Sequence, residues 1–299
     1  PVPTGTDAGV ITAEAAEKTG LAPSTHIVSI SHDQVSAAIG AGAFDSSVAV
    51  DGAGTVECVT PIYDSIPDIE AMYDGYFSIV PYVIPGKYVA YAFSYTGGAL
   101  IQWCVDNLAK DEKRAAADRD LSVNEYLEKK YATERGEENP SNLLILPHFA
   151  GAATPYMDTG SKGAILGLTI DTTVADIYRG CMEGVVYEML VNTSALKKSG
   201  CKFKKLNATG GGARSGEWMQ MKADMLNVPI TALKTVDAGT VGSAMLTGIA
   251  TGVFKDLNDA AEHMVEETVE YLPRKEMHEK YMHIFERYAK VYQAVRPLV

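Results

Sequence analysis

The sequence predicts an α/β protein in which helices cover a mixed β-sheet. Three observations predict this fold class. Short β-rich segments dominate the first third of the chain, helical and β-rich segments alternate after residue 143, and three glycine-rich turns each follow a predicted strand. Hairpin turns favour antiparallel neighbours, whereas strands that alternate with helices favour parallel ones. Both patterns occur here, so we expect a mixed sheet.

Most of the predicted hairpins lie in the N-terminal part. A short helix over residues 11–20 ends at Gly20, and a small apolar helix begins at Asp33. A hairpin turn is expected at residues 51–54, between two β-rich segments. The predicted strands of this part are residues 26–31, 47–50 and 55–60, and two within 76–95 around Pro85 and Gly86.

Helices are more frequent in the rest of the chain. An amphipathic helix is expected over 99–108, and residues 110–142 are expected to form a polar surface insertion with a solvated helix at 121–131. A long helix over 173–198 has apolar residues at helical spacing and a capping segment at 171–173. The other predicted strands are 143–146, 165–170, 205–208 and 229–233, and the other predicted helices are 218–226, 242–251 and about 281–295.

Composition excludes several classes of protein. Of 299 residues, 46% are hydrophobic and 21% are charged, which is typical of a globular chain. The net charge of −12 argues against a nucleic-acid backbone as partner. No apolar run approaches about 18 residues, and no charged-then-apolar leader is visible, so we expect neither a membrane span nor secretion. The four cysteines form no CxxC pair, which favours buried thiols in a reducing cytoplasm.

Three glycine-rich loops, at 51–55, 96–98 and 209–212, are candidates for a nucleotide site. Glycine lets backbone N–H groups approach an anion, and the second and third loops open onto helices, whose first N–H groups favour phosphate. None of the loops matches a Walker A motif or a dinucleotide fingerprint. One such loop alone is usually a turn, but three in one α/β chain indicate a nucleotide site.

Asp33 is the candidate catalytic side chain. It follows a predicted strand and begins a predicted helix. One interpretation is an N-cap, a position that Asp fills well. The other is a general base at the end of a buried strand.

Several motifs, in sequence order, resemble the C-terminal half of the FGGY carbohydrate kinases, the family of xylulose, gluconate and glycerol kinases. Residues 31–34, Ser-His-Asp-Gln, resemble its catalytic-aspartate motif. Residues 163–168 with Asp176, Ile177 and Glu183 resemble its second signature, in which Gly180 and Cys181 depart from the usual residues. The other matching segments are 5–21 (entry segment), 54–55 (phosphate loop), 98–103 (nucleotide segment) and 210–220 (adenine-side loop).

The resemblance implies an actin-like, ribonuclease-H-like fold over residues 1–299, of which the chain supplies the nucleotide-binding domain. ATP with Mg²⁺ would phosphorylate a sugar or polyol hydroxyl, and Asp33 would accept the hydroxyl proton. The family's N-terminal domain, which carries much of the sugar pocket and helps to hold magnesium, is not found in these residues, and no metal ligand is assigned. A homodimer is common in the family. The nucleotide-binding residues that the resemblance implies are Gly54, Thr55, Gly98, Gln102, Gly210, Gly211, Gly212 and Ser215.

Two other functions stay open from the sequence. The chain could be a non-catalytic actin-like module that binds nucleotide for assembly or regulation, in which case a base beside a sugar hydroxyl has no use. It could also be an α/β interaction domain in which the glycine loops are only turns. Nucleotide binding by the chain would count against the interaction domain. A catalytic role of Asp33 would count against the non-catalytic module.

Overall fold

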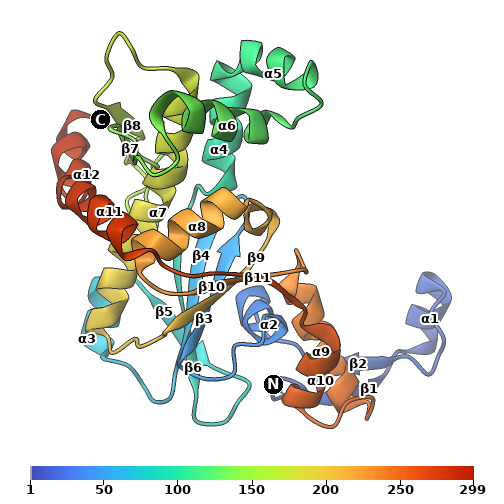
Figure 1. Cartoon of the computed structure of the whole chain (residues 1–299). Coiled ribbons are helices and arrows are strands. Elements are labelled where there is room, and N and C mark those ends of the chain that lie inside the picture. Colours follow the sequence, from blue (N-terminus) through green and yellow to red (C-terminus); the bar gives the residue numbers. More distant parts are fainter. Residues whose placement is uncertain (1) are drawn as a thin grey trace.

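A computed structural model describes residues 2–299, and its main feature is a seven-stranded mixed sheet with the strand order β11-β10-β9-β3-β4-β6-β5 (Figure 1). β3, β9 and β10 run parallel, and the other neighbours pair antiparallel. The carboxyl ends of the three parallel strands therefore meet at one edge. The strands are β3 (Val48–Ala53), β4 (Glu57–Tyr63), β5 (Ser78–Pro81), β6 (Tyr88–Ser94), β9 (Lys205–Thr209), β10 (Ile230–Leu233) and β11 (Glu267–Tyr271).

Helices cover both faces of this sheet. Alternate residues of β3 enter two separate cores, Val50 on one side and Ala49 and Ala53 on the other, as the period of a strand requires. The face that includes Val50 packs against α2 (Asp33–Gly40), α9 (Ala238–Ala250) and α10 (Leu257–Met264). The opposite face packs against α4 (Gly98–Leu108), α7 (Val174–Lys198) and α8 (Gly216–Leu226), with α11 (Lys275–Tyr288) and α12 (Val291–Val295) outside them and η2 (Arg296–Leu298) at the end.

The close packing expected of the small-residue helix is confirmed, and its partner is α2. A Cβ atom on Gly242 of α9 would collide with the backbone carbonyl of Ser36, and one on Gly40 of α2 would collide with the carbonyl of Ala238. The backbones of the two helices therefore touch, which only glycine at these positions permits. The start of α2 also lies close to the start of α9, since a Cβ atom on Gly239 would lie 3.5 Å from the carbonyl oxygen of Asp33.

The polar segment 110–142 forms two helices, α5 (Lys110–Ala117) and α6 (Val123–Arg135). The prediction of a solvated helix is wrong for one side of α6, which is buried. Leu127 is 0% exposed and Tyr131 is 4% exposed, and both join the core beside α7. Arg135 closes the contact with two hydrogen bonds of 2.9 and 2.8 Å to the carboxylate of Asp176. The many charges on the outer face of α6 hid this buried stripe from the sequence analysis.

An arm at the N-terminus projects from the body in Figure 1. β1 (Asp7–Val10) and β2 (His26–Val28) pair antiparallel on either side of α1 (Ala13–Thr19). Gly20 ends α1 with a φ of 73°, as predicted. Among residues 2–299 we find no helix with the length and hydropathy that crossing a membrane requires.

Several elements differ from the predictions. The first hairpin turn lies at residues 54–56 instead of 51–54, because Asp51 remains in β3 and pairs with a buried lysine. β1, α3 (Ile69–Asp74), α10 and β11 were not predicted, and the last helix is divided into α11 and α12. The short strand β7 (Leu144–Leu146) matches the strand predicted at 143–146, whereas β8 (Ala164–Leu166) covers only the first two residues of the strand predicted at 165–170. All four cysteines are buried and free as expected.

Candidate functional site

The three glycine-rich loops meet at the edge where the parallel strands end. The hairpin loop 54–56 joins β3 to β4, and the Gly98 loop joins β6 to α4. Two hydrogen bonds join these loops directly. The N–H of Gly97 donates to the carbonyl of Thr55 and the N–H of Gly98 to the carbonyl of Gly54, each with an N–O distance of 2.9 Å. The first N–H groups of α4 are therefore used within the protein, and Gly98 serves the close approach of two backbones instead of offering a free donor.

The third loop packs on the end of β3. Gly210 has a φ of +95°, and a Cβ atom there would lie 2.5 Å from the carbonyl oxygen of Ala53. Gly212 is equally confined, with its Cβ position 2.7 Å from the ring of Trp218. Gly211, which begins the short helix η1 (Gly211–Arg214), has no atom within 4 Å of the same position. Gly211 thus faces open space, while its neighbours lie against the sheet.

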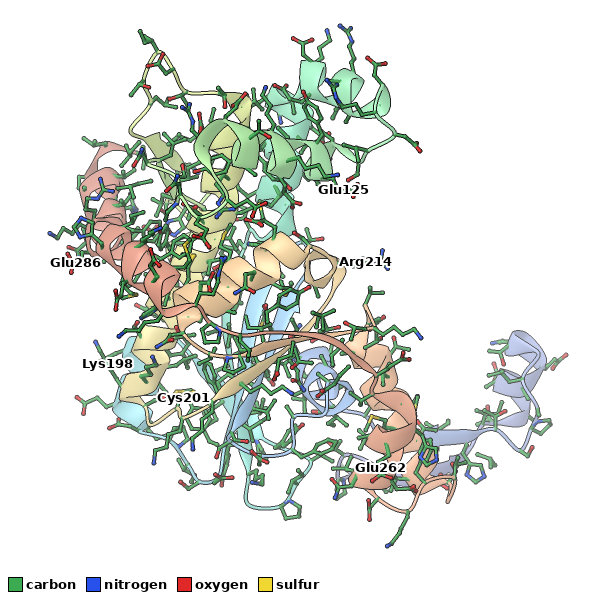
Figure 2. All side chains as sticks on the ribbon, in the orientation of Figure 1. Glu125, Lys198, Cys201, Arg214, Glu262 and Glu286 are labelled. Atoms are coloured by element: carbon green, nitrogen blue, oxygen red, sulfur yellow. The ribbon has the colours of Figure 1, made fainter. Side chains whose placement is uncertain are left out.

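Several hydrogen-bond donors of these loops are unpaired. Within residues 2–299 no acceptor is found for the N–H groups of Gly211 and Gly212, nor for the N–H and hydroxyl of the exposed Thr55. Figure 2 shows the side chain of Arg214 at the outer end of the third loop, pointing away from the sheet. Unpaired backbone N–H groups on loops that pack together can bind an anion.

Asp33 lies on the opposite face of the sheet from α8, at the first residue of α2. The N-cap is His32, whose ring accepts from the N–H of Gln34, so the capping interpretation of Asp33 is wrong by one residue. The Asp33 side chain is 77% exposed; its Oδ1 accepts from the N–H of Gln34 over 2.7 Å, and no partner within residues 2–299 contacts Oδ2. One carboxylate oxygen is therefore free to accept a proton.

The residue before Asp33 packs on a strand of the sheet, since the ring of His32 lies 5.3 Å from the ring of Tyr91 on β6, centre to centre. Burial raises the pKa of Cys58, the second residue of β4, to about 12, and the negative charge of Asp33 adds to this increase. Burial likewise raises the pKa of Tyr91 on β6 to about 12, again with a contribution from Asp33. The start of α2 therefore lies over the paired strands β4 and β6.

Ser215 is tied to a residue that the sequence analysis missed. Its hydroxyl oxygen accepts from the N–H of Trp218 over 3.1 Å, which caps α8, and its hydroxyl donates to Glu128 of α6 over 3.1 Å. Burial raises the pKa of Glu128. The segment 110–142, which was predicted to be a surface insertion, thus reaches the end of the third loop.

The predicted Gln102 lies one turn after Gly98 on α4, where it is exposed and contacts Asp106.

A buried ionic cluster lies beneath the hairpin loop. The ammonium of Lys222 on α8 is 2.7 Å from Asp51 Oδ2 on β3 and 2.6 Å from Glu57 Oε1 on β4. None of the three side chains is more than 1% exposed. Burial and the neighbouring Asp51 raise the pKa of Glu57. In the sequence, Asp51 resembles a turn residue and Lys222 stands in a stripe of core methionines, so nothing linked them.

The structure therefore brings together the predicted residues Gly54, Thr55, Gly98 and Gly210–Gly212, with Gln102 and Ser215 on the helices that leave the second and third loops. It places Asp33 at the start of α2, on the other face of the sheet from α8. Within the described residues there is no group of three or more His, Cys, Asp or Glu side chains that could hold a metal ion. The arrangement can bind a polyanion at the loops and offers the exposed carboxylate of Asp33 on the α2 side of the sheet.

Comparison with known proteins matches this chain to one family. The family model described as "FGGY family of carbohydrate kinases, C-terminal domain" matches residues 54–251. The chain is 26% identical over 288 residues to the xylulose kinase of Staphylococcus epidermidis, which covers 96% of this chain and 54% of that protein. It is 32% identical over 221 residues to the glycerol kinase of Aquifex aeolicus, which covers 73% of this chain and 41% of that protein.

Solved structures show the same fold. The ligand-bound xylulose kinase of Lactobacillus acidophilus superposes with a TM-score of 0.83 at 23% identity, over 99% of this chain and 57% of that one. The glycerol kinase of Plasmodium falciparum with ADP gives a TM-score of 0.76 at 18% identity, over 96% and 55%. The predicted actin-like fold is confirmed, and the chain spans about half the length of the relatives it matches.

Proposed function

Because the chain belongs to the FGGY family of carbohydrate kinases, we propose that it is the nucleotide-binding half of an enzyme that phosphorylates a sugar or polyol hydroxyl with ATP. The observation that carries the proposal is the position of Asp33. One of its carboxylate oxygens has no partner, and the start of α2, where it stands, packs on the sheet that carries the loop with the unpaired N–H and hydroxyl of Thr55. A free carboxylate in the same domain as an anion-binding loop suits proton removal during phosphoryl transfer.

The reaction would proceed as an in-line transfer between the two halves of the site. The acceptor hydroxyl oxygen forms a bond to the γ-phosphorus, and the bond from that phosphorus to the bridging oxygen of ADP breaks. The proton of the hydroxyl moves to Oδ2 of Asp33. General-base assistance of this kind contributes about 10²–10⁴-fold to a rate. Most of the remaining acceleration in phosphoryl transfer comes from positioning and charge stabilisation.

The nucleotide would bind along the three loops. The free N–H groups of Thr55, Gly211 and Gly212 suit the phosphates and the ribose. Gly54 and Gly98 keep the first two loops close together, and Gln102 extends from the second loop. Gly211 and Ser215 would border the adenine or the ribose, where Glu128 accepts from Ser215, and Gly210 would hold the third loop against the end of β3.

Magnesium would enter with ATP as the Mg·ATP complex. The residues described supply no cluster of metal-ligating side chains, so the steps above depend on no ligand of this chain to the metal. When bound to ATP, the cation neutralises charge on the phosphates.

The partner that the proposal requires is an N-terminal kinase half that completes the sugar pocket and excludes water when the two halves close. The relatives of roughly twice this length support it. We also propose that the enzyme works in the cytoplasm, where ATP is present and the four buried thiols stay reduced. A homodimer stays a prediction.

A transfer assay tests the proposal. The chain is assayed alone and joined to the N-terminal half of a xylulose kinase, with Mg·ATP and a panel that includes xylulose, gluconate and glycerol. We expect the joined protein to release ADP only when at least one of these acceptors is added, and the chain alone to phosphorylate little of any acceptor. Nucleotide binding without acceptor-dependent ADP release would instead favour the non-catalytic nucleotide-binding module.

A further inference from the structure

The buried cluster of Lys222, Asp51 and Glu57 is a group of charges that the proposed reaction does not use. Its single ammonium faces two carboxylates, and the second oxygens of these carboxylates, Asp51 Oδ1 and Glu57 Oε2, have no hydrogen-bond partner within residues 2–299. Such groups are expensive to remove from water, and replacing a buried ion pair by apolar side chains often leaves stability unchanged or higher. Stability alone is therefore a poor reason for this cluster.

The cluster joins the bases of two loops of the site. Asp51 lies three residues before Gly54, and Glu57 lies two residues after Thr55. The ammonium of Lys222 therefore pairs with both strands of the hairpin. Lys222 comes from α8, the helix that follows the third loop. These residues are 171 and 165 positions apart in the chain, so the cluster ties distant segments together.

A second contact carries the link to the third loop itself. The ammonium of Lys222 lies 4.6 Å from the centre of the Trp218 ring, one turn earlier on α8. The same ring confines Gly212, as its 2.7 Å approach to the Cβ position shows. The ammonium, the indole ring and the glycine backbone therefore form a continuous packed path from the hairpin to the free N–H groups of the third loop.

We propose that Lys222 is a positioning residue that sets the spacing between the hairpin loop 54–56 and the glycine loop 210–212, and so aligns the N–H groups on which the nucleotide would bind. This inference rests on the proposed function, because the nucleotide is the ligand whose binding the spacing controls. Lys222 itself does not touch the ligand. Displacing such a site by about 1 Å can cost on the order of a hundredfold in function.

The test removes the charges without leaving any of them unpaired. The triple variant K222M/D51N/E57Q keeps the approximate volume of each side chain and loses all three charges. K222R serves as the conservative variant, which keeps the cation. The affinity of the complete 299-residue chain for Mg·ADP is measured by calorimetry, and its stability by urea unfolding. Amide hydrogen exchange is followed at residues 54–56 and 210–214.

A matched control comes from the same helix. Asp224 of α8 is 0% exposed and pairs with Arg274 over 2.7 Å, away from the loops. The variant D224N/R274M therefore removes from α8 an ion pair with a buried carboxylate and a half-exposed guanidinium, and it does not touch the proposed link. It should bind Mg·ADP as the unmodified chain does, even where its unfolding midpoint falls.

We expect the triple variant to stay folded, to bind Mg·ADP at least about tenfold more weakly and to exchange faster at both loops. K222R should bind Mg·ADP more tightly than the triple variant and more weakly than the unmodified chain. Unchanged affinity and exchange in a folded triple variant would overturn the positioning role, as would equal affinity losses in the triple variant and the control. If the unmodified chain binds no nucleotide, the proposed function fails first and this inference fails with it. If the triple variant unfolds, affinity loss in a folded K222R supports the inference, and unchanged K222R affinity and exchange overturn it.

Discussion

Two aspartates lie at the same edge of the sheet, on its opposite faces, and differ in almost every physical respect. Asp33, beside α2, is 77% exposed and has an oxygen without a partner. Asp51, beside α8, is 0% exposed and pairs with the ammonium of Lys222. An exposed carboxylate can exchange a proton with a substrate, whereas a buried and paired one can only hold its surroundings in place. The sheet thus separates the group suited to chemistry from the groups suited to positioning.

Removing the exposed carboxylate should have the largest effect. We expect Asp33→Asn to lower acceptor-dependent ADP release about 10²–10⁴-fold in the chain joined to an N-terminal kinase half, with nucleotide affinity unchanged. The physical reason is the loss of the proton acceptor without any change to the loops. Asp111→Asn on α5, whose side chain is 90% exposed, is the control and should leave both quantities unchanged. A matching loss of nucleotide affinity in Asp33→Asn would contradict the separation.

The two neighbouring glycines of the third loop provide the next test. Gly210→Ala places a Cβ atom 2.5 Å from the carbonyl of Ala53 at a φ of +95°, and we expect it to destabilise the chain by about 1–3 kcal/mol. Gly211→Ala meets no atom within 4 Å and should unfold like the unmodified chain. Its methyl group enters the open space, however, so nucleotide affinity should fall. Urea unfolding and calorimetry measure the two effects, and unaltered affinity in Gly211→Ala would show that the ligand does not pass there.

A smaller effect is expected at Ser215. Replacing it by alanine removes the cap of α8 and the hydrogen bond to Glu128, which should cost about 1 kcal/mol in the free energy of unfolding and weaken nucleotide binding. Thr173→Ala removes the hydroxyl cap of α7 and should cost a similar free energy without changing nucleotide affinity. If both variants bind nucleotide equally well, Ser215 is only a helix cap.

A third aspartate, Asp176 at the start of α7, should show the smallest effect. Burial alone would raise the pKa of Asp176, but hydrogen bonds from Arg135 and Thr173 outweigh it and hold the pKa below the ordinary value of 3.8. The carboxylate therefore stabilises the fold above about pH 4, and this contribution disappears as the pH falls through its lowered pKa. Asp176→Asn should lower the Tm by a few degrees at pH 7, and the difference should narrow in acid. A difference that is constant from pH 3 to pH 7 would contradict this assignment.

The exposed residues of the site could be predicted from the sequence far better than the buried ionic cluster beneath it. Asp33, Thr55 and Gly211 stand in local motifs, and local motifs are readable because chain neighbours fix their geometry. The contact of Lys222 with Asp51 depends on the register of β3 and the facing of α8, which join residues 171 positions apart. Its partners also carried misleading local signals, since Asp51 before glycine resembles a turn.

The same reasoning explains the errors in the fold. The central strands and α7 were predicted because their apolar residues follow a clear period. β11, an edge strand of sequence Glu-Thr-Val-Glu-Tyr, lacks an apolar run because four of its five residues are exposed. Glu128 was missed because α6 is polar over most of its surface, and only the folded chain brings it to Ser215.

The most direct test is a calorimetric titration of the 299-residue chain with Mg·ATP and Mg·ADP, beside the variant Asp33→Asn. The account predicts that one nucleotide binds per chain, with the same affinity in both proteins, because the loops form the site and Asp33 only serves the transfer step. Absence of binding up to millimolar nucleotide in both proteins would contradict the claim that the loops form a nucleotide site. Binding that disappears with Asp33 would contradict the separation of the two faces.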